Sequence, residues 1–234
     1  MVDVKILGHR GYSEKYVENT LESFQKAIEY GADGVELDVY WTKDGEVVVT
    51  HDSNLKRVFN VDLDVREVNS KKIPKNIPRL YEIFEIMLDD KIINVEIKDA
   101  NNAEKIVQYV LKKRKQEIIF SSFEHDIIIK LSRIYGNEKF GLLFDERHKN
   151  LNLNDLRDLF YKTNIFSAHI PIQLYYIDEK LFFEFLTFLK KLGKKIVIWT
   201  VNSEEEVEML KGLADYIITD CVEKIVGYLK KTGR

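Results

Sequence analysis

The chain has 234 residues, 45% of them hydrophobic and 12% aromatic, which is enough apolar material for a sizeable core. Its formal net charge of −3 gives no basic surplus of the kind that indicates nucleic-acid binding. A single cysteine, Cys221, excludes an intrachain disulfide, and no apolar stretch approaches the roughly 20 residues that cross a bilayer. The apolar run in the amino-terminal MVDVKILGHRGY is too short for a signal peptide, so we expect a cytoplasmic protein with no stable membrane anchor.

Two kinds of segment alternate along the chain. Short runs rich in β-branched residues predict buried strands. In chain order these are Val4–His9, Gly34–Tyr40, Ile92–Lys98, Glu117–Ser122, Lys139–Phe144, Ile165–Ile170, Lys195–Val201 and Asp215–Thr219. The segments with helical periodicity are Thr20–Tyr30, Leu80–Leu88, Ala103–Lys113, His125–Tyr135, Leu153–Tyr161, Asp178–Leu192, Glu204–Lys211 and Val222–Lys231.

Eight strands alternating with eight helices predict one α/β domain, a single (β/α)₈ TIM barrel over residues 1–234. A doubly wound sheet is the competing arrangement, but no G-x-G-x-x-G follows a strand to support its dinucleotide-binding form. The first helix carries its own boundary signals. We expect a capping box between Asn19 and Glu22 at its start and a C-cap glycine, Gly31, at its end.

The alternation breaks after the second strand. Asp44-Gly45 lies between YWTK and EVVV, which is a strong signal for a β-hairpin. With these two as the turn residues, Asp38 is predicted to lie opposite His51. The next segment, 53–78, contains polar turns and two prolines and is predicted to be a small insertion over the barrel mouth.

Carboxylates interrupt the strand patterns near the carboxyl ends of the strands. Side chains alternate along a strand, so Glu36 and Asp38 share the face opposite the apolar residues, and Glu96 in INVEIK does the same. In a barrel that face points inward. Buried carboxylates cost several kcal/mol each unless a cation compensates them, and a set of oxygen ligands suits Mg²⁺ or Ca²⁺.

Histidines and cationic side chains fall at the same end of the predicted barrel. His9 closes the first strand and His51 follows the hairpin, so they offer an acid and a base near neutral pH. Arg10 and Lys98 supply positive charge for a phosphate, although they could instead form structural ion pairs with the carboxylates. Trp199 ends a strand, and a substrate-stacking role for it depends on the local twist.

Several short motifs, in order along nearly the whole chain, resemble the glycerophosphodiester phosphodiesterase family. They are HRG at 9–11, ENT at 18–20, GADGVELDV at 31–39, TKDGEVVVTHD at 42–52, IPRLYEIF at 77–84, VEIK at 95–98, WTVN at 199–202 and ADYIITD at 214–220. The resemblance implies a metal-dependent TIM barrel that hydrolyses glycerophosphodiesters to glycerol 3-phosphate and an alcohol. It implies metal ligands Glu36, Asp38 and Glu96, catalytic residues His9 and His51, and phosphate contacts Arg10 and Lys98.

Other functions fit the pattern less well. A phospholipase-type phosphodiesterase needs an apolar path to the mouth, which the short insertion makes hard to build. A non-catalytic barrel that binds phosphorylated ligands has no use for an acid–base pair. Either histidine fits either role, and attack by a substrate hydroxyl instead of water would form a cyclic phosphate first. The helix EKLFFEFLTFLKKL at 179–192 carries extra apolar surface, which leaves a homodimer or a lipid-facing surface open.

Overall fold

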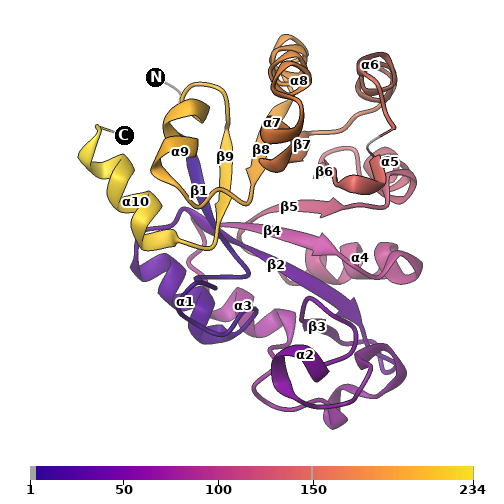
Figure 1. Cartoon of the computed structure of the whole chain (residues 1–234). Coiled ribbons are helices and arrows are strands. Elements are labelled where there is room, and N and C mark those ends of the chain that lie inside the picture. The colour runs from indigo at the N-terminus through magenta and orange to yellow at the C-terminus, as the bar shows by residue number, and fades with distance from the viewer. Residues whose placement is uncertain (1–3, 149, 234) are drawn as a thin grey trace.

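A computed structural model describes residues 4–148 and 150–233 of the chain. Its centre is a closed barrel of parallel strands, because the first strand pairs with both the second and the last (Figure 1). The barrel strands are β1 (Lys5–His9), β2 (Gly34–Trp41), β4 (Ile92–Ile97), β5 (Glu117–Ser122), β6 (Lys139–Leu143), β7 (Ser167–Pro171), β8 (Lys195–Trp199) and β9 (Tyr216–Thr219).

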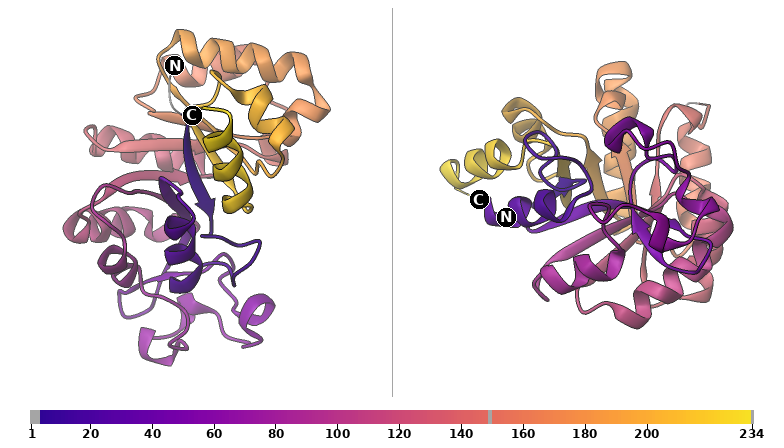
Figure 2. Two further views of the ribbon diagram at one scale, coloured as in Figure 1. Left: turned by 90° about the vertical axis from the view of Figure 1, so that its left-hand side faces the viewer. Right: turned by 90° about the horizontal axis from the view of Figure 1, so that it is seen from below.

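Helices connect the strands and cover the outside of the barrel (Figures 1 and 2). They are α1 (Leu21–Glu29), α3 (Leu80–Ile86), α4 (Ala103–Lys113), α5 (His125–Ile134), α6 (Leu153–Tyr161), α8 (Glu179–Lys191), α9 (Glu204–Leu210) and α10 (Val222–Lys231). Shorter elements are the helices α2 (Lys56–Phe59) and α7 (Gln173–Ile177) and the 3₁₀ turns η1 (Val65–Glu67), η2 (Ser70–Lys72), η3 (Ala100–Asn102) and η4 (Glu146–His148). The predicted (β/α)₈ barrel is confirmed.

The alternation of side chains along the strands divides the core into two parts. Outward residues such as Val35, Leu37 and Val95 pack with the helices in one large apolar cluster. Residues of the opposite face, including Leu7 and Ile119, form a smaller cluster inside the barrel. This division leaves the remaining inward positions, close to the carboxyl ends of the strands, for polar side chains.

The start of α1 differs from the prediction. Its N-cap is Thr20, which forms a capping box with Ser23, so the expected pairing of Asn19 with Glu22 is wrong. Asn19 adopts the left-handed conformation, with φ 56°. Its side-chain amide donates to Asp38 Oδ2 at 2.9 Å. Because Asn19 makes this long-range hydrogen bond to a buried carboxylate, it lies outside the helix. The N-cap is therefore the next residue, Thr20.

The hairpin forms, but its register is one residue away from the prediction. β3 (Val47–Val49) runs antiparallel to β2 on the outside of the barrel, and the Thr50 N–H donates to the Asp38 carbonyl at 3.0 Å. Asp38 therefore lies opposite Thr50 and not opposite His51. The turn spans three residues, Lys43 to Gly45, in which Gly45 takes a left-handed conformation with φ 86° and Asp44 does not, whereas a two-residue type I′ turn requires positive φ at both Asp44 and Gly45.

The segment 53–78 packs on this hairpin with a small core of its own. Arg79, the residue that directly follows the segment, donates hydrogen bonds from its guanidinium to four of the segment's backbone carbonyls. The core consists of Val48 on β3 together with Leu55, Val65, Ile73 and Ile77. The hairpin thus holds the insertion to the barrel. In Figure 1 the insertion lies at the lower edge of the molecule, beside the end of β2.

The apolar surplus of α8 is largely absorbed by the protein itself. Five of its residues are buried: Phe182, Phe185, Leu186, Phe188 and Leu189. In the part of the chain that is described, no helix combines the length and apolar character needed to cross a membrane. The oligomeric state stays a prediction.

Candidate active site

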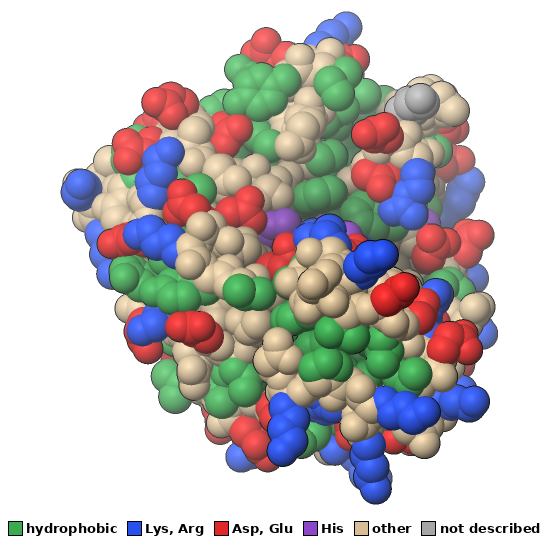
Figure 3. Space-filling view, turned by 60° about the horizontal axis from the view of Figure 1, so that its bottom comes forward, with side chains coloured by type: hydrophobic (Ala, Val, Ile, Leu, Met, Phe, Trp, Pro, Cys, Tyr) green, Lys and Arg blue, Asp and Glu red, His purple; other side chains and the backbone are tan. Residues whose placement is uncertain are grey.

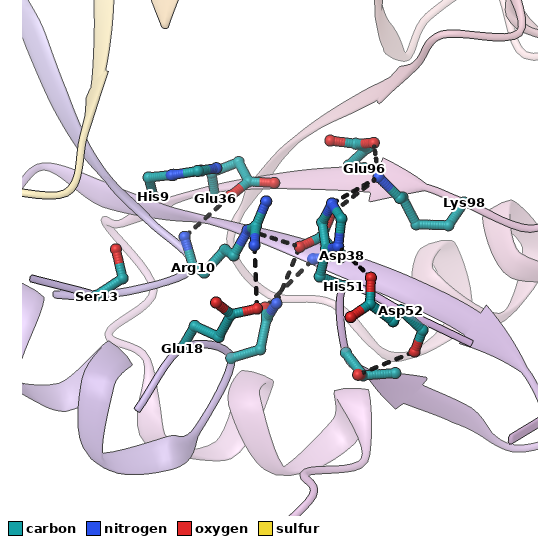
Figure 4. A network of polar contacts seen from close by, with 12 residues as sticks. His9, Arg10, Ser13, Glu18, Glu36, Asp38, His51, Asp52, Glu96 and Lys98 are labelled. Atoms are coloured by element: carbon teal, nitrogen blue, oxygen red, sulfur yellow. Dashed lines mark hydrogen bonds and ion pairs between the residues drawn. The ribbon is translucent and has the colours of Figure 1, made fainter. Parts of the chain in front are cut away.

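Three carboxylates converge at the carboxyl-terminal end of the barrel (Figure 4). Glu36 and Asp38 lie on β2, and the parallel register places Asp38 beside Glu96 on β4. One oxygen atom from each of the three lies within 4.8 Å of the others. Their exposed fractions are only 3%, 1% and 8%. Strand alternation and adjacent pairing are sufficient to bring the three groups together.

The electrostatics of this triad are unfavourable. Burial, followed by the charge of Asp38, raises the pKa of Glu36 to about 8, and the same two causes raise the pKa of Glu96. Burial also opposes ionisation of Asp38, but the charges of Lys98 and Arg10 outweigh it and lower the pKa of that carboxyl. The protein therefore has difficulty in holding all three groups ionised at neutral pH.

Two cationic side chains form ion pairs with two of the three carboxylates, Asp38 and Glu96. Lys98 Nζ lies 2.7 Å from Glu96 Oε1 and 3.6 Å from Asp38 Oδ1, and Arg10 Nε lies 3.4 Å from Asp38 Oδ2. Asp38 Oδ1 is buried and accepts no hydrogen bond. A buried set of oxygen atoms with one such unsatisfied acceptor fits a hard divalent cation, so the residues present suit Mg²⁺ or Ca²⁺.

Each predicted catalytic histidine is held by a carboxylate. His9 Nδ1 lies 2.7 Å from Asp220 Oδ1, and His51 Nδ1 lies 2.7 Å from Asp52 Oδ1. Because an ionised carboxylate only accepts hydrogen bonds, Nδ1 carries the proton in both rings. Nε2 is then the free basic atom of the neutral form, and in His51 it lies 3.3 Å from Lys98 Nζ.

The surroundings move the pKa values of the two histidines in opposite directions. Burial opposes the charged form of His9, but the hydrogen bond to Asp220 and the charge of Glu36 outweigh it and raise the pKa. Burial lowers the pKa of His51, and the neighbouring charge of Lys98 acts in the same direction, against the opposing effect of Asp38. The two rings are therefore biased towards different protonation states.

A cavity of about 290 Å³ opens above these groups. Figure 3 looks towards it and shows histidine side chains bordered by Lys, Arg, Asp and Glu side chains. The polar part of the wall includes His9, Arg10, Glu36, His51, Glu96 and Lys98, and the other part includes Phe123, Leu143, Asp145, Arg147 and Trp199. All the predicted site residues therefore line the cavity except Asp38, whose side chain is buried.

Sequence reasoning did not single out Asp220 as a site residue. It directly follows β9, so the rule that points to polar groups at strand ends could have identified it. The pattern likewise allowed Asp52 to cap a turn as readily as to orient His51. Trp199 does face the cavity and packs edge-on against Phe123, with ring centroids 5.9 Å apart.

The chain matches known proteins over nearly its whole length. The glycerophosphoryl diester phosphodiesterase family matches residues 9–224. The chain belongs to this family. A glycerophosphodiester phosphodiesterase from Caldanaerobacter subterraneus subsp. tengcongensis is 32% identical over 97% of this chain and 98% of its own length. As a family member, the chain is a glycerophosphodiester phosphodiesterase with an acidic triad suited to a divalent cation.

Solved structures of phosphodiesterases support the same fold. The crystal structure of the Thermotoga maritima glycerophosphodiester phosphodiesterase superimposes with a TM-score of 0.85 at 40% identity, covering 94% of this chain and 96% of that one. An Oleispira antarctica phosphodiesterase, solved with the product sn-glycerol-3-phosphate, gives a TM-score of 0.81 at 22% identity, covering 97% and 96% of the two chains. The latter likeness bears on the fold alone.

Without a divalent cation, stability is expected to fall as the pH rises from about 5 to 8. The pKa of Glu36 is about 8 in the folded protein, against an ordinary value of 4.5. The folded state therefore holds this proton more tightly, so the stabilisation is complete below about pH 4.5 and is lost as the pH passes through 8. In chelator, the Tm of the wild type should fall between about pH 5 and 8. The fall in Glu36→Gln should be roughly 5–10 °C smaller, because Gln has no proton to lose. Equal declines in the two proteins would contradict this assignment.

Proposed function

We propose that the protein hydrolyses glycerophosphodiesters to glycerol 3-phosphate and an alcohol with a divalent cation, Mg²⁺ or Ca²⁺, held by Glu36, Asp38 and Glu96. The observation that carries the proposal is the convergence, at one end of the barrel, of an oxygen-only triad and two histidines, each oriented by a carboxylate. The Oleispira antarctica phosphodiesterase, which has the same fold, was solved with sn-glycerol-3-phosphate, the product proposed for this chain. A non-catalytic phosphate-binding barrel has no need for the paired histidines.

Opposite pKa shifts suggest different tasks for the two histidines. His51, whose Nε2 is kept unprotonated beside Lys98, takes the proton from the attacking hydroxyl. His9, whose charged form is favoured by Asp220, donates a proton to the departing oxygen as the P–O bond breaks. A bound cation supplies polarisation of a phosphoryl oxygen and stabilises the developing charge. The same proton transfers serve attack by water and attack by a neighbouring glycerol hydroxyl.

The remaining wall of the cavity is proposed to hold the organic part of the substrate. Phe123, Leu143 and Trp199 form its apolar face, so the aromatic ring of Trp199 would contact the glycerol or the leaving alcohol.

The described residues of segment 53–78 contribute nothing to this wall, and the placement of the segment over the barrel mouth stays a prediction. A single domain over residues 1–234 and a cytoplasmic location also stay predictions.

The direct test measures glycerol 3-phosphate released from glycerophosphocholine in excess Mg²⁺ or Ca²⁺ and in chelator. We expect turnover with at least one of the cations and loss of turnover in chelator, restored when the cation is added back. Absence of the product from every glycerophosphodiester tried, with either cation and a folded protein, would overturn the proposed function.

Lys98→Met tests the proposed phosphate contact. Met keeps the aliphatic stem and removes the charge, so we expect kcat/KM to fall about 10- to 100-fold in saturating cation, the loss typical of a hydrogen bond to a charged group. In saturating cation the carboxylates are compensated, and Tm should change by no more than about 2 °C. In chelator Tm should fall further, because Glu96 loses its partner at 2.7 Å. Near-normal turnover with a large drop in Tm in saturating cation would indicate a structural ion pair instead.

A further inference from the structure

A charged side chain of the insertion, which does not line the cavity, contacts the carboxylate that holds His51. Arg57, in α2 of segment 53–78, donates from Nε to Asp52 Oδ2, while the other oxygen of that carboxylate holds His51 Nδ1. The two terminal nitrogens of Arg57 bond both oxygens of Glu18, at 2.6 and 3.2 Å. A guanidinium that engages a carboxylate through two parallel hydrogen bonds is fixed in orientation as well as in position.

Glu18 also contacts Arg10, the residue proposed to bind the phosphate. Arg10 Nη1 donates to Glu18 Oε1 at 3.0 Å, and Arg10 Nε lies 3.4 Å from Asp38 Oδ2 (Figure 4). The side chains of Arg10 and Glu18 are only 18% and 20% exposed, so water screens this pair incompletely. One carboxylate, Asp52, therefore connects Arg57 to His51, and another, Glu18, connects Arg57 to Arg10.

In the described part of the chain, Asp52 has no second Lys or Arg partner that could replace Arg57. Within residues 4–148 and 150–233, Arg57 is the only Lys or Arg that pairs with Asp52. If Arg57 were removed, one oxygen of Asp52 would lose its partner, and the carboxylate could rotate away from His51. Glu18 would keep Arg10 but lose the two bonds that fix its own orientation.

We propose that Arg57 is a positioning residue that sets the orientation of His51 and Arg10 through Asp52 and Glu18. The inference rests on the proposed roles of His51 as base and Arg10 as phosphate contact. Arg57 does not line the cavity and does not touch the substrate. It gives the insertion a part in the reaction that its small apolar core alone would not provide.

The same insertion contains a matched pair that contacts neither His51 nor the carboxylate that holds it. Arg66 has a side chain 49% exposed, against 50% for Arg57, and it bonds Asp64 at 2.6 and 3.0 Å. Asp64 in turn accepts from Ser53 and contacts neither histidine. Exposed pairs of this kind contribute little to stability, so both arginines can be replaced in a folded protein.

The experiment compares Arg57→Gln with Arg66→Gln, using glycerophosphocholine in saturating Mg²⁺. For Arg57→Gln we expect kcat to fall about tenfold with KM within about threefold, whereas Arg66→Gln keeps kcat within about twofold. Tm of both variants should stay within about 2 °C of the wild type. Unchanged kcat in Arg57→Gln, or an equal fall in Arg66→Gln, overturns the proposal.

A double-mutant cycle identifies the route of the effect. In an Asp52→Asn background the further change Arg57→Gln should cost less than about threefold in kcat, because the link to His51 is already weakened. A full tenfold loss in both backgrounds would show that Arg57 does not act through Asp52. Arg57→Lys should lose an intermediate amount, since one ammonium cannot engage both carboxylates in the same way, and it serves as the test if Arg57→Gln does not fold.

A readout that needs no turnover separates this inference from the proposed function. In proton–nitrogen NMR spectra, the Nδ1 proton of His51, assigned by its loss in His51→Ala, should be protected from exchange in the wild type and in Arg66→Gln. In Arg57→Gln we expect it to broaden or exchange. If the wild type releases no glycerol 3-phosphate, the proposed function fails while this comparison still decides whether Arg57 holds His51; an unchanged His51 signal in Arg57→Gln overturns the proposal.

Discussion

Glu36→Gln is expected to abolish both turnover and the stabilisation that Mg²⁺ or Ca²⁺ gives to the wild type. A cation that binds only the folded state at 100 times its Kd adds about 2.7 kcal/mol, which corresponds to roughly 5–10 °C in Tm for a chain of this length. Gln retains the shape of Glu36 and an oxygen that can still accept from the Arg10 N–H, which lies 3.0 Å away. The barrel should therefore stay folded while its cation site loses a charged ligand.

The measurement is thermal unfolding in chelator and in excess cation, together with turnover under the same conditions. Glu96→Gln should behave like Glu36→Gln. Glu117→Gln is the control: this exposed carboxylate starts β5 at the opposite end of the barrel and pairs with Lys139 at 2.7 Å. It should keep the full increment in Tm and normal turnover. Full activity after exhaustive chelation, or a normal increment in Glu36→Gln, would show that the triad has been assigned wrongly.

The period-two pattern made the triad predictable from sequence. Val35 and Leu37 had to face the helices, so Glu36 and Asp38 had to face the barrel interior, and parallel pairing then brought Glu96 beside them. These steps use only local periodicity and the closure of the sheet. The same steps account for the agreement between predicted and observed strands, whose boundaries differ by a few residues at most.

Features that depend on specific partners were not predictable in this way. His9 and Asp220 are separated by 211 positions, and nothing local in either segment identifies the other as its partner. The hairpin register changed by one residue because only Gly45 of the turn is left-handed, which gives a three-residue turn, whereas a two-residue type I′ turn needs a left-handed Asp44 as well. The position of Arg57 depends on how the insertion packs, and that packing is a property of the folded segment.

Replacing either of the two proposed catalytic histidines should remove turnover and leave cation binding intact. His51→Ala and His9→Ala are each expected to lower kcat about 10²- to 10⁴-fold, the usual contribution of a general acid or base. Their cation-dependent rise in Tm should equal that of the wild type, because the oxygen triad is unchanged. Loss of that rise in His51→Ala would mean that the histidine is a metal ligand, and the division of roles would be wrong.

The choice of leaving group then distinguishes the two histidines. A nitrophenolate departs without a proton, whereas an alkoxide such as that of choline needs one. His9→Ala, which lacks the proposed acid, should therefore recover much of its rate on a nitrophenyl phosphodiester, relative to the wild type on the same substrate. His51→Ala lacks the proposed base and should remain impaired on both substrates, because the attacking hydroxyl must still lose its proton. The reverse pattern would exchange the two roles, making His51 the acid, even though its pKa is lowered by burial and by the charge of Lys98.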